Sequence, residues 1–307
     1  MSKEKKLRQK LTIMLIFILV AGLLNAKVDS NAGEYGFQFL KIPVSPELAG
    51  MGNAGDMLNN SPLAIFHSPV AFNWQRGAFV AASQTNWFVG TNMYNLAYRN
   101  VGLTRSFGFG VVYMDHGTFD RREENGTLIG NYYPMDMRVT GNYAFRLTPN
   151  INIGANANIL YEKIDTSSSL AFTADLGYVF YTPIANTTFD FSVKNIGGST
   201  KMDEENIDIP IIVDGGISTG FIPNEIVGFY PSLKVSYMRD HDNLLPALGL
   251  QMKLYDMLFI RAGYKFNYNE ENLSAGFGLH YRNVKFDYSF MNNEIEGLHL
   301  FGLGWEF

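Results

Sequence analysis

Cysteine is absent from the 307 residues of the chain. The protein therefore has no disulfide framework, no thiolate metal site and no cysteine that could carry an N-terminal lipid anchor. Long apolar runs are scarce as well. Beyond an uncharged stretch from Leu11 to Leu24, no segment approaches the roughly 20 apolar residues that a membrane-spanning helix needs. These absences exclude a helical membrane protein and a disulfide-stabilised scaffold.

The first 26 residues have the features of a signal peptide. Basic residues precede the apolar stretch, which is too short to span a membrane, and Ala26 follows it, so we expect cleavage there. The 24 basic and 29 acidic residues of the chain include five basic and one acidic residue before this point. The remainder has 19 basic and 28 acidic residues and a net charge of −9, which excludes nucleic acid as a partner.

Alternation with a period of two dominates the last fifty residues. In the final run one face carries Phe301, Leu303, Trp305 and Phe307, and the other face carries mostly glycine or charge. Aromatic residues gather near the ends of such runs, where membrane barrels have their aromatic girdles, whereas a soluble sandwich has no need of them there. An exported chain rich in Gly, Tyr and Phe, with a mean hydropathy near zero, fits the same class. We therefore predict an all-β fold, a transmembrane antiparallel β-barrel in an outer membrane.

The alternating pattern continues upstream and divides the chain into a signal peptide (1–26), an N-terminal plug segment (27–75) and a barrel (76–307). We count 14 runs, at 77–88, 92–100, 103–116, 133–146, 151–163, 169–181, 187–195, 210–219, 231–239, 244–253, 257–267, 272–281, 284–291 and 297–307. An even count places both ends of the barrel on the periplasmic side, with short turns there and the longest outer loops at 117–132 and 196–209. The connection at 220–230 is long for a periplasmic turn, so the register could be displaced by one hairpin there.

Proline and glycine are dense between residues 27 and 75 and leave room only for a turn or two of helix. This segment also carries more apolar side chains than a free tail can expose to water, so we expect it to occupy the barrel lumen. Its stretch Phe39-Leu40-Lys41-Ile42, followed by Ser45-Pro46-Glu47-Leu48-Ala49-Gly50-Met51-Gly52-Asn53-Ala54-Gly55, resembles the opening of PorV/PorQ-type proteins, relatives of the FadL-like outer membrane barrels. Those families have an Asn-Pro-Ala element further on, and Ser68-Pro69-Val70 keeps its proline.

The resemblance assigns the plug motif to Pro46, Gly50, Met51, Gly52, Ala54, Gly55 and Pro69, and it implies a non-enzymatic role in type IX secretion, holding or handing over exported cargo. A FadL-like conduit for hydrophobic compounds, with an apolar luminal site that opens sideways to the bilayer, is the second hypothesis. The expected partners are outer membrane lipid, the barrel insertion machinery and either secretion-system components or a hydrophobic ligand. Phe307 resembles the C-terminal signal that this machinery reads.

Charged residues on the inward face of the runs have mixed sign, so we expect them to pair with one another and with the plug and not to form a selectivity ladder. They are Arg138, Glu162, Asp175, Asp190, Lys194, Lys234, Arg261, Lys265, Lys285 and Asp287. A third hypothesis, an outer membrane hydrolase, rests on Asp115-His116 and Asp240-His241-Asp242 at the outer rim. No serine lies in a Gly-x-Ser-x-Gly turn, and no group of His, Asp and Glu has the spacing of metal ligands, so the sequence predicts neither a metal nor another cofactor.

Overall fold

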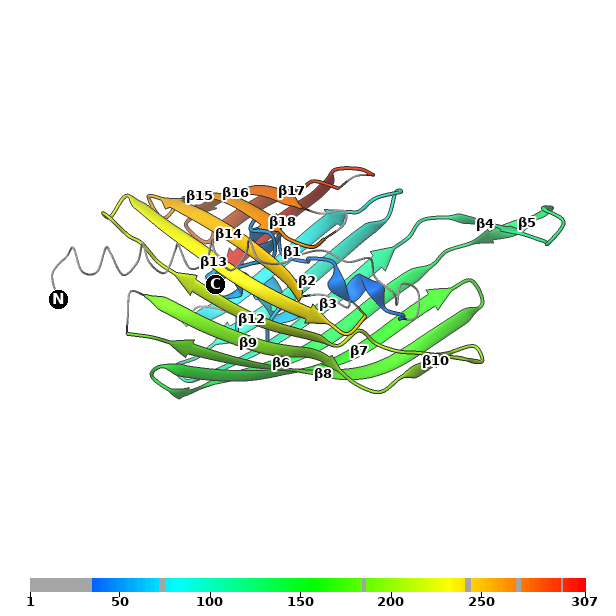
Figure 1. The fold of residues 1–307 in the computed structure, drawn as a ribbon, viewed down its shortest axis with the longest axis horizontal. Coiled ribbons are helices and arrows are strands. Elements are labelled where there is room, and N and C mark those ends of the chain that lie inside the picture. Colours follow the sequence, from blue (N-terminus) through cyan, green and yellow to red (C-terminus); the bar gives the residue numbers. More distant parts are fainter. Residues whose placement is uncertain (1–34, 72–74, 184–185, 241–243, 269–271, 294) are drawn as a thin grey trace.

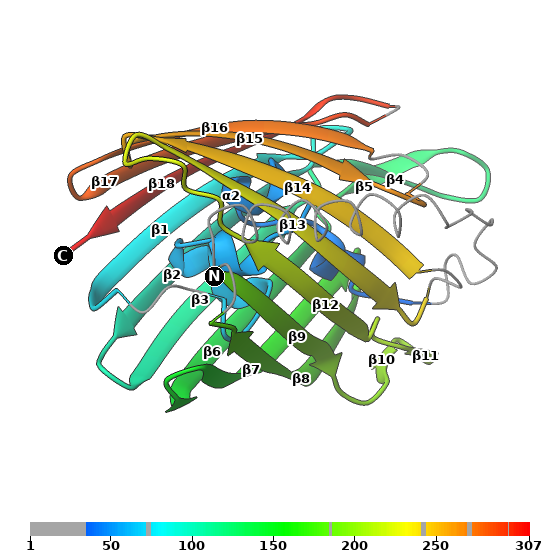
Figure 2. The ribbon, with the colours of Figure 1, turned by 60° about the vertical axis from the view of Figure 1, so that its left-hand side comes forward.

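A closed antiparallel barrel of 14 strands forms the body of the protein in the computed structural model, which describes residues 35–71, 75–183, 186–240, 244–268, 272–293 and 295–307. This confirms the predicted fold class. The barrel strands are β1 (Gly77–Asn86), β2 (Asn92–Val101), β3 (Arg105–Asp115), β6 (Met135–Thr148), β7 (Ile151–Ile164), β8 (Ser167–Tyr181), β9 (Thr187–Ile196), β12 (Ile212–Thr219), β13 (Val227–Met238), β14 (Leu244–Leu254), β15 (Leu258–Lys265), β16 (Leu273–Tyr281), β17 (Val284–Met291) and β18 (Leu298–Glu306). Pairing of β1 with β18 closes the barrel, from Phe79 opposite Glu306 to Asn86 opposite His299 (Figures 1 and 2).

The outer surface of the barrel is apolar. Successive side chains of a strand point to opposite faces, and the apolar residues of the alternating pattern fall on the outer face. Along β18, Leu300 is fully buried toward the lumen, whereas Leu303 points outward and is 60% exposed. The apolar residues of the alternating pattern therefore point outward, as in a membrane barrel, whose apolar outer face meets lipid. Within the described residues, no helix is long and apolar enough to cross a bilayer.

The two ends of the barrel differ in the length of their connections. The turn end, where the C-terminus lies, joins strands by the connections 102–104, 149–150, 182–186, 220–226, 255–257 and 282–283. At the opposite, loop end, two short hairpins interrupt the long connections: β4 (Phe119–Arg122) with β5 (Leu128–Tyr132), and β10 (Thr200–Met202) with β11 (Glu205–Ile207). The β4–β5 hairpin projects well beyond the strands (Figure 1).

Strand β13 starts at Val227, four residues before the predicted start of its run, so the connection is shorter than expected and the register is not displaced by a hairpin. Pro231 explains the discrepancy. It lies inside the strand, although proline cannot donate to a ladder. Pairing with β12 stops at Ser218 opposite Ser232 and resumes as an isolated bridge between Phe221 and Phe229. The proline thus lies at a gap in the ladder with β12, while the ladder with β14 continues past it.

Residues 35–71, called here the plug segment, lie inside the barrel (Figure 2). They contain four short helical pieces, the 3-10 helices η1 (Gln38–Lys41), η2 (Asp56–Leu58) and η3 (Pro62–Phe66) and the α-helix α2 (Pro46–Ala49). Pro46 and Pro62 each begin a piece, the position in which a missing N–H costs nothing. The segment starts at the loop end, where Tyr35 pairs with Asp208, and leads to β1 at the turn end. The predicted signal peptide lies outside the described residues.

Candidate functional site: the plugged lumen

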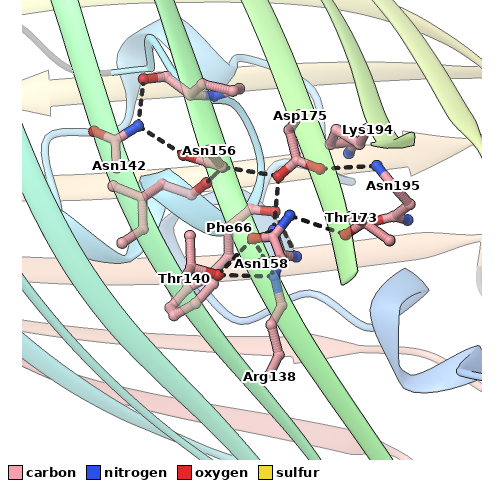
Figure 3. A network of polar contacts seen from close by, with 12 residues as sticks. Phe66, Arg138, Thr140, Asn142, Asn156, Asn158, Thr173, Asp175, Lys194 and Asn195 are labelled. Carbon is pink, nitrogen blue, oxygen red and sulfur yellow. Dashed lines mark hydrogen bonds and ion pairs between the residues drawn. The ribbon is translucent and has the colours of Figure 1, made fainter. Parts of the chain in front are cut away.

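A buried polar network joins the plug segment to strands β6, β7 and β8 (Figure 3). At its centre an Arg138 Nη2 donates to Asp175 Oδ2 at 2.8 Å, and both side chains are almost fully buried. Asn156 donates to the same carboxylate oxygen at 2.8 Å, and the backbone N–H of Asn195 donates to the other at 2.8 Å. The carboxylate is therefore held from three sides, which compensates for its removal from water.

The same network binds backbone carbonyls at the end of η3, where a helix leaves oxygens without intrahelical donors. Asn156 donates to the Ile65 carbonyl at 2.8 Å, and Arg138 donates to the Phe66 carbonyl at 3.4 Å. Arg99 on β2 donates to the carbonyls of Pro69 and Ala71 at 3.3 and 3.2 Å, and Asn142 also donates to Pro69 at 3.0 Å. Side-chain donors of the barrel strands thus hold residues 65–71, called here the lower plug, by their backbone carbonyls.

A second group of buried charges joins η2 to β9, β12 and β13. Lys234 Nζ lies 2.9 Å from Asp56 Oδ2 of the plug and 3.3 Å from Asp214 Oδ2, and Lys194 Nζ lies 2.7 Å from that same Asp214 oxygen. Asp190 is buried beside them. Lys234 thus links a carboxylate of the plug to one of the wall, and Lys194 pairs with the wall carboxylate.

A third group lies around α2. Arg261 donates to Asp287 Oδ1 at 2.7 Å and to Gln251 at 2.8 Å, and His280 Nε2 is 3.1 Å from Asp287 Oδ2. Glu47 of the plug is buried next to them and accepts from the Asn60 backbone N–H at 3.2 Å. Burial raises the pKa of the Glu47 carboxyl, and the neighbouring Asp287 carboxylate raises it further.

The remaining inward charges lie nearer the ends of the lumen. Glu162 accepts the Phe37 backbone N–H at 2.6 Å, close to the loop end. Lys265 lies 4.9 Å from the centre of the Tyr268 ring, and Lys285 lies 5.7 Å from that of Phe79. Sequence reasoning left out Arg99, Asp56 and Asp214, although Arg99 and Asp214 lie on the inward face of predicted runs.

The glycines of the plug motif lie where the plug touches the wall most closely. A Cβ on Gly50 would be 3.1 Å from Gly276 Cα, and one on Gly52 would be 3.1 Å from the Tyr264 nitrogen. Gly52 and Gly55 also have positive φ values of 66° and 88°, a conformation that glycine adopts without strain. Pro46 lies against Gly302, Met51 lies against Gly249, Ala54 is fully buried, and the Pro69 carbonyl is the one that Arg99 and Asn142 bind. The motif residues therefore share one role, which is to let the plug segment pack closely against the barrel wall.

His67 ties two parts of the plug together. Its Nε2 accepts the backbone N–H groups of Val44 and Ser45 at 3.3 and 3.2 Å, so the ring is neutral, with its proton on Nδ1. Burial holds the pKa of His67 well below its ordinary value, and the nearby Lys194 and Lys234 lower it further. This histidine is a structural acceptor.

At the rim, the described Asp and His residues of the third hypothesis contact other partners and not their neighbours in the sequence. His116 Nε2 lies 2.8 Å from Asp136 Oδ2 and not against Asp115, which accepts the Gly117 backbone N–H instead. The hydrogen bond to Asp136 raises the pKa of His116. Asp240 forms an ion pair with Lys41 of the plug, while His241 and Asp242 lie outside the described residues.

A cavity of about 740 Å³ opens above the plug segment at the loop end. Much of its wall is aromatic or aliphatic, and the aromatic members are Tyr35, Phe39, Trp87, Phe88, Phe119, Tyr132 and Tyr268. The plug contributes Phe39 and Ile42 to its floor, while His116, Asp136, Glu162, Lys41 and Lys265 add polar groups at its edges. This volume and this lining suit a small organic molecule.

Several solved structures have the same fold. CymD, a monoaromatic hydrocarbon channel, has a TM-score of 0.64 at 15% identity, covering 86% of this chain and 97% of its own. The toluene transporter TodX of Pseudomonas putida has a TM-score of 0.57 at 10% identity, covering 84% and 96%. A FadL homologue of Pseudomonas aeruginosa has a TM-score of 0.51 at 12% identity, covering 86% and 98%. No protein-family model matches the chain, and no curated protein is detectably similar in sequence.

These likenesses establish a fold shared with FadL-type hydrocarbon channels. At identities of 10 to 15% they show the fold alone. They lend nothing to the PorV/PorQ assignment or to the type IX secretion role.

Loss of the central carboxylate tests the first network. In Asp175→Ala, the Arg138 guanidinium loses its buried counter-charge, and breaking such a pair costs about 3 to 5 kcal/mol. We expect the denaturant midpoint of the folded protein in detergent to fall sharply. Asp120→Ala is the control, because the Asp120–Arg122 pair is about half exposed and a surface pair contributes little. Equal midpoints for the two variants would contradict the assignment.

Proposed function

We propose that the protein is an outer membrane channel for hydrophobic small molecules, with the loop-end cavity as the site where they enter. The observation that carries this proposal is the cavity, whose aromatic walls lie directly above a plug inside a barrel. An apolar ligand gains free energy from burial at about 25 cal/mol per Å² of apolar surface, and flat aromatic walls suit an aromatic ligand. The fold shared with hydrocarbon channels supports the same class of ligand.

In this proposal the plug segment keeps the barrel closed to ions and water while the cavity collects ligand. Phe39 and Ile42 form the boundary between the cavity and the interior. Passage requires the upper plug, residues 35–42, to shift. Among the described residues, its polar contacts with the wall include the Gly36 N–H to the Asp208 carbonyl, the Phe37 N–H to Glu162, and Lys41 to Asp240, and Phe37 and Phe39 add apolar packing. The lower plug, with its buried guanidinium contacts, stays in place.

Toluene serves as the probe for a test. Titration calorimetry on the detergent-solubilised protein should show saturable binding, and Trp87→Ala should weaken it about tenfold, because a lost aromatic contact of about 1.4 kcal/mol has that effect. Tyr255→Ala is the matched control, since Tyr255 lies at the turn end and is 70% exposed. Uptake of radiolabelled toluene by cells that express each form should follow the binding order. Saturable binding that Trp87→Ala leaves unchanged would place the site elsewhere, and no binding or uptake would refute the proposal.

A further inference from the structure

Three side chains that can bind a metal meet where α2 touches the wall. Glu47 comes from the plug, His280 from β16 and Asp287 from β17, and their ligating atoms all lie within 4.8 Å of one another. His280 Nε2 and Asp287 Oδ2 are already 3.1 Å apart, a separation that two ligands of one zinc or manganese ion can have at bond lengths of about 2.0 to 2.2 Å. No other such group of three occurs among the described residues.

The local backbone makes room for this group. Gly278 lies opposite Asp287 in the β16–β17 pairing, and a Cβ at residue 278 would overlap the Asp287 carboxylate. Gly50 and Gly276 let α2 approach the strands, which brings Glu47 to the same place. A cavity of about 20 Å³ borders both carboxylates. A space of that size holds one water molecule, and a divalent ion is smaller.

Two carboxylates are buried close together at this place, with two cations nearby. Arg261 neutralises Asp287 through Oδ1, and Asp287 Oδ2 faces the imidazole. The carboxylate of Glu47 is buried against Asp287, with a backbone N–H on its Oε2 and with Arg261 and Lys285 as the cations in its surroundings. Two buried like charges at short range favour either a shared proton or a bound cation.

We propose that Glu47, His280 and Asp287 bind one divalent transition-metal ion, of the class of Zn²⁺ or Mn²⁺, which fastens the plug segment to the barrel wall. One imidazole and two carboxylates suit this class, whereas Mg²⁺ and Ca²⁺ prefer sites made only of oxygen. The ligands come from the plug on one side and the wall on the other, so the ion would add a direct link between these two parts of the protein. The proposal does not depend on what the channel carries.

Zinc binding to the purified protein tests the site. The mature chain, without an affinity tag, is stripped with chelator, dialysed and titrated with ZnCl₂ in detergent. We expect one ion per chain by calorimetry and by elemental analysis, and a higher unfolding temperature with zinc than without. Glu47→Gln keeps an acceptor for the Asn60 N–H but loses the charged ligand, so zinc affinity should fall by at least about tenfold. The zinc-dependent rise in unfolding temperature should disappear.

His116→Gln is the matched control, because His116 also pairs with an aspartate but belongs to no group of three ligands. It should bind zinc as the wild type does. Assembly of each variant is checked by its heat-dependent gel mobility, and His280→Gln replaces Glu47→Gln if the latter does not assemble. Absence of stoichiometric binding by the wild type, or undiminished binding by the ligand variant, would overturn the proposal and leave a shared proton as the explanation of the paired carboxylates.

Discussion

Planar bilayers that contain a variant lacking residues 27–74 should show large, steady ion conductance, whereas the intact protein should conduct little. The plug segment fills the middle of the lumen, where Phe37, Ala49, Ala64 and Ile65 have no exposed surface. Every strand of the barrel remains in the variant, and each strand pairs with two strand neighbours. A barrel of this size is wider than the eight-stranded barrels whose side chains fill the interior, so an open lumen would hold water.

The deletion also removes the partners of several wall residues, so stability should fall while assembly persists. Arg138 keeps Asp175, and Lys234 keeps Asp214, but both lose their contacts to the plug. A deletion of residues 118–132 serves as the control, because it removes the projecting β4–β5 hairpin and leaves the lumen filled. Conductance of the intact protein equal to that of the plug deletion would mean that the plug does not seal the barrel.

Period-two alternation was sufficient to predict the barrel, because a strand exposed to lipid on one face and to a polar lumen on the other has to alternate strictly. The pairing of β17 with β18 illustrates this, since Phe286 and Leu303 meet on the outside while Asp287 and Gly302 meet inside. Ends of strands were predicted less well. Val227 to Tyr230 lack a clean alternation and precede a proline, so β13 was cut short. The β4–β5 and β10–β11 hairpins were missed within the outer loops, because short exposed strands have no buried face to produce a pattern.

The inward position of the charged residues follows from the same alternation, but their partners do not. Arg138 and Asp175 are on strands that are not adjacent, and their contact depends on the curvature of the wall. Asp56 lies in the plug, which has no periodicity to place it. The group of Glu47, His280 and Asp287 shows the limit most clearly. Spacing along the chain could suggest His280 and Asp287, which are diagonal neighbours on the paired strands β16 and β17, but Glu47 reaches them only through the docking of α2.

A single methyl group should displace the plug where it lies closest to the wall. In Gly263→Ala, the new Cβ would fall far inside van der Waals contact of the Gly52 nitrogen and the Met51 carbonyl carbon. Both of these are backbone atoms, so no side-chain rotation can relieve the overlap. The β15 backbone is fixed by its ladders to β14 and β16, whereas residues 50–55 are held mainly by turns. The plug should therefore move, and the variant should assemble normally yet conduct ions in planar bilayers.

The conductance of Gly263→Ala should lie between those of the intact protein and the plug deletion, because the contacts of η3 with Arg138 and Asn156 are distant from the substitution and persist. Gly141→Ala is the matched control, since it adds the same methyl group within a barrel strand at a position with no atom within 4 Å. Only the luminal glycine should open the barrel. If the Gly263→Ala protein assembles but does not conduct ions, the barrel wall and not the plug moves to accommodate the methyl group.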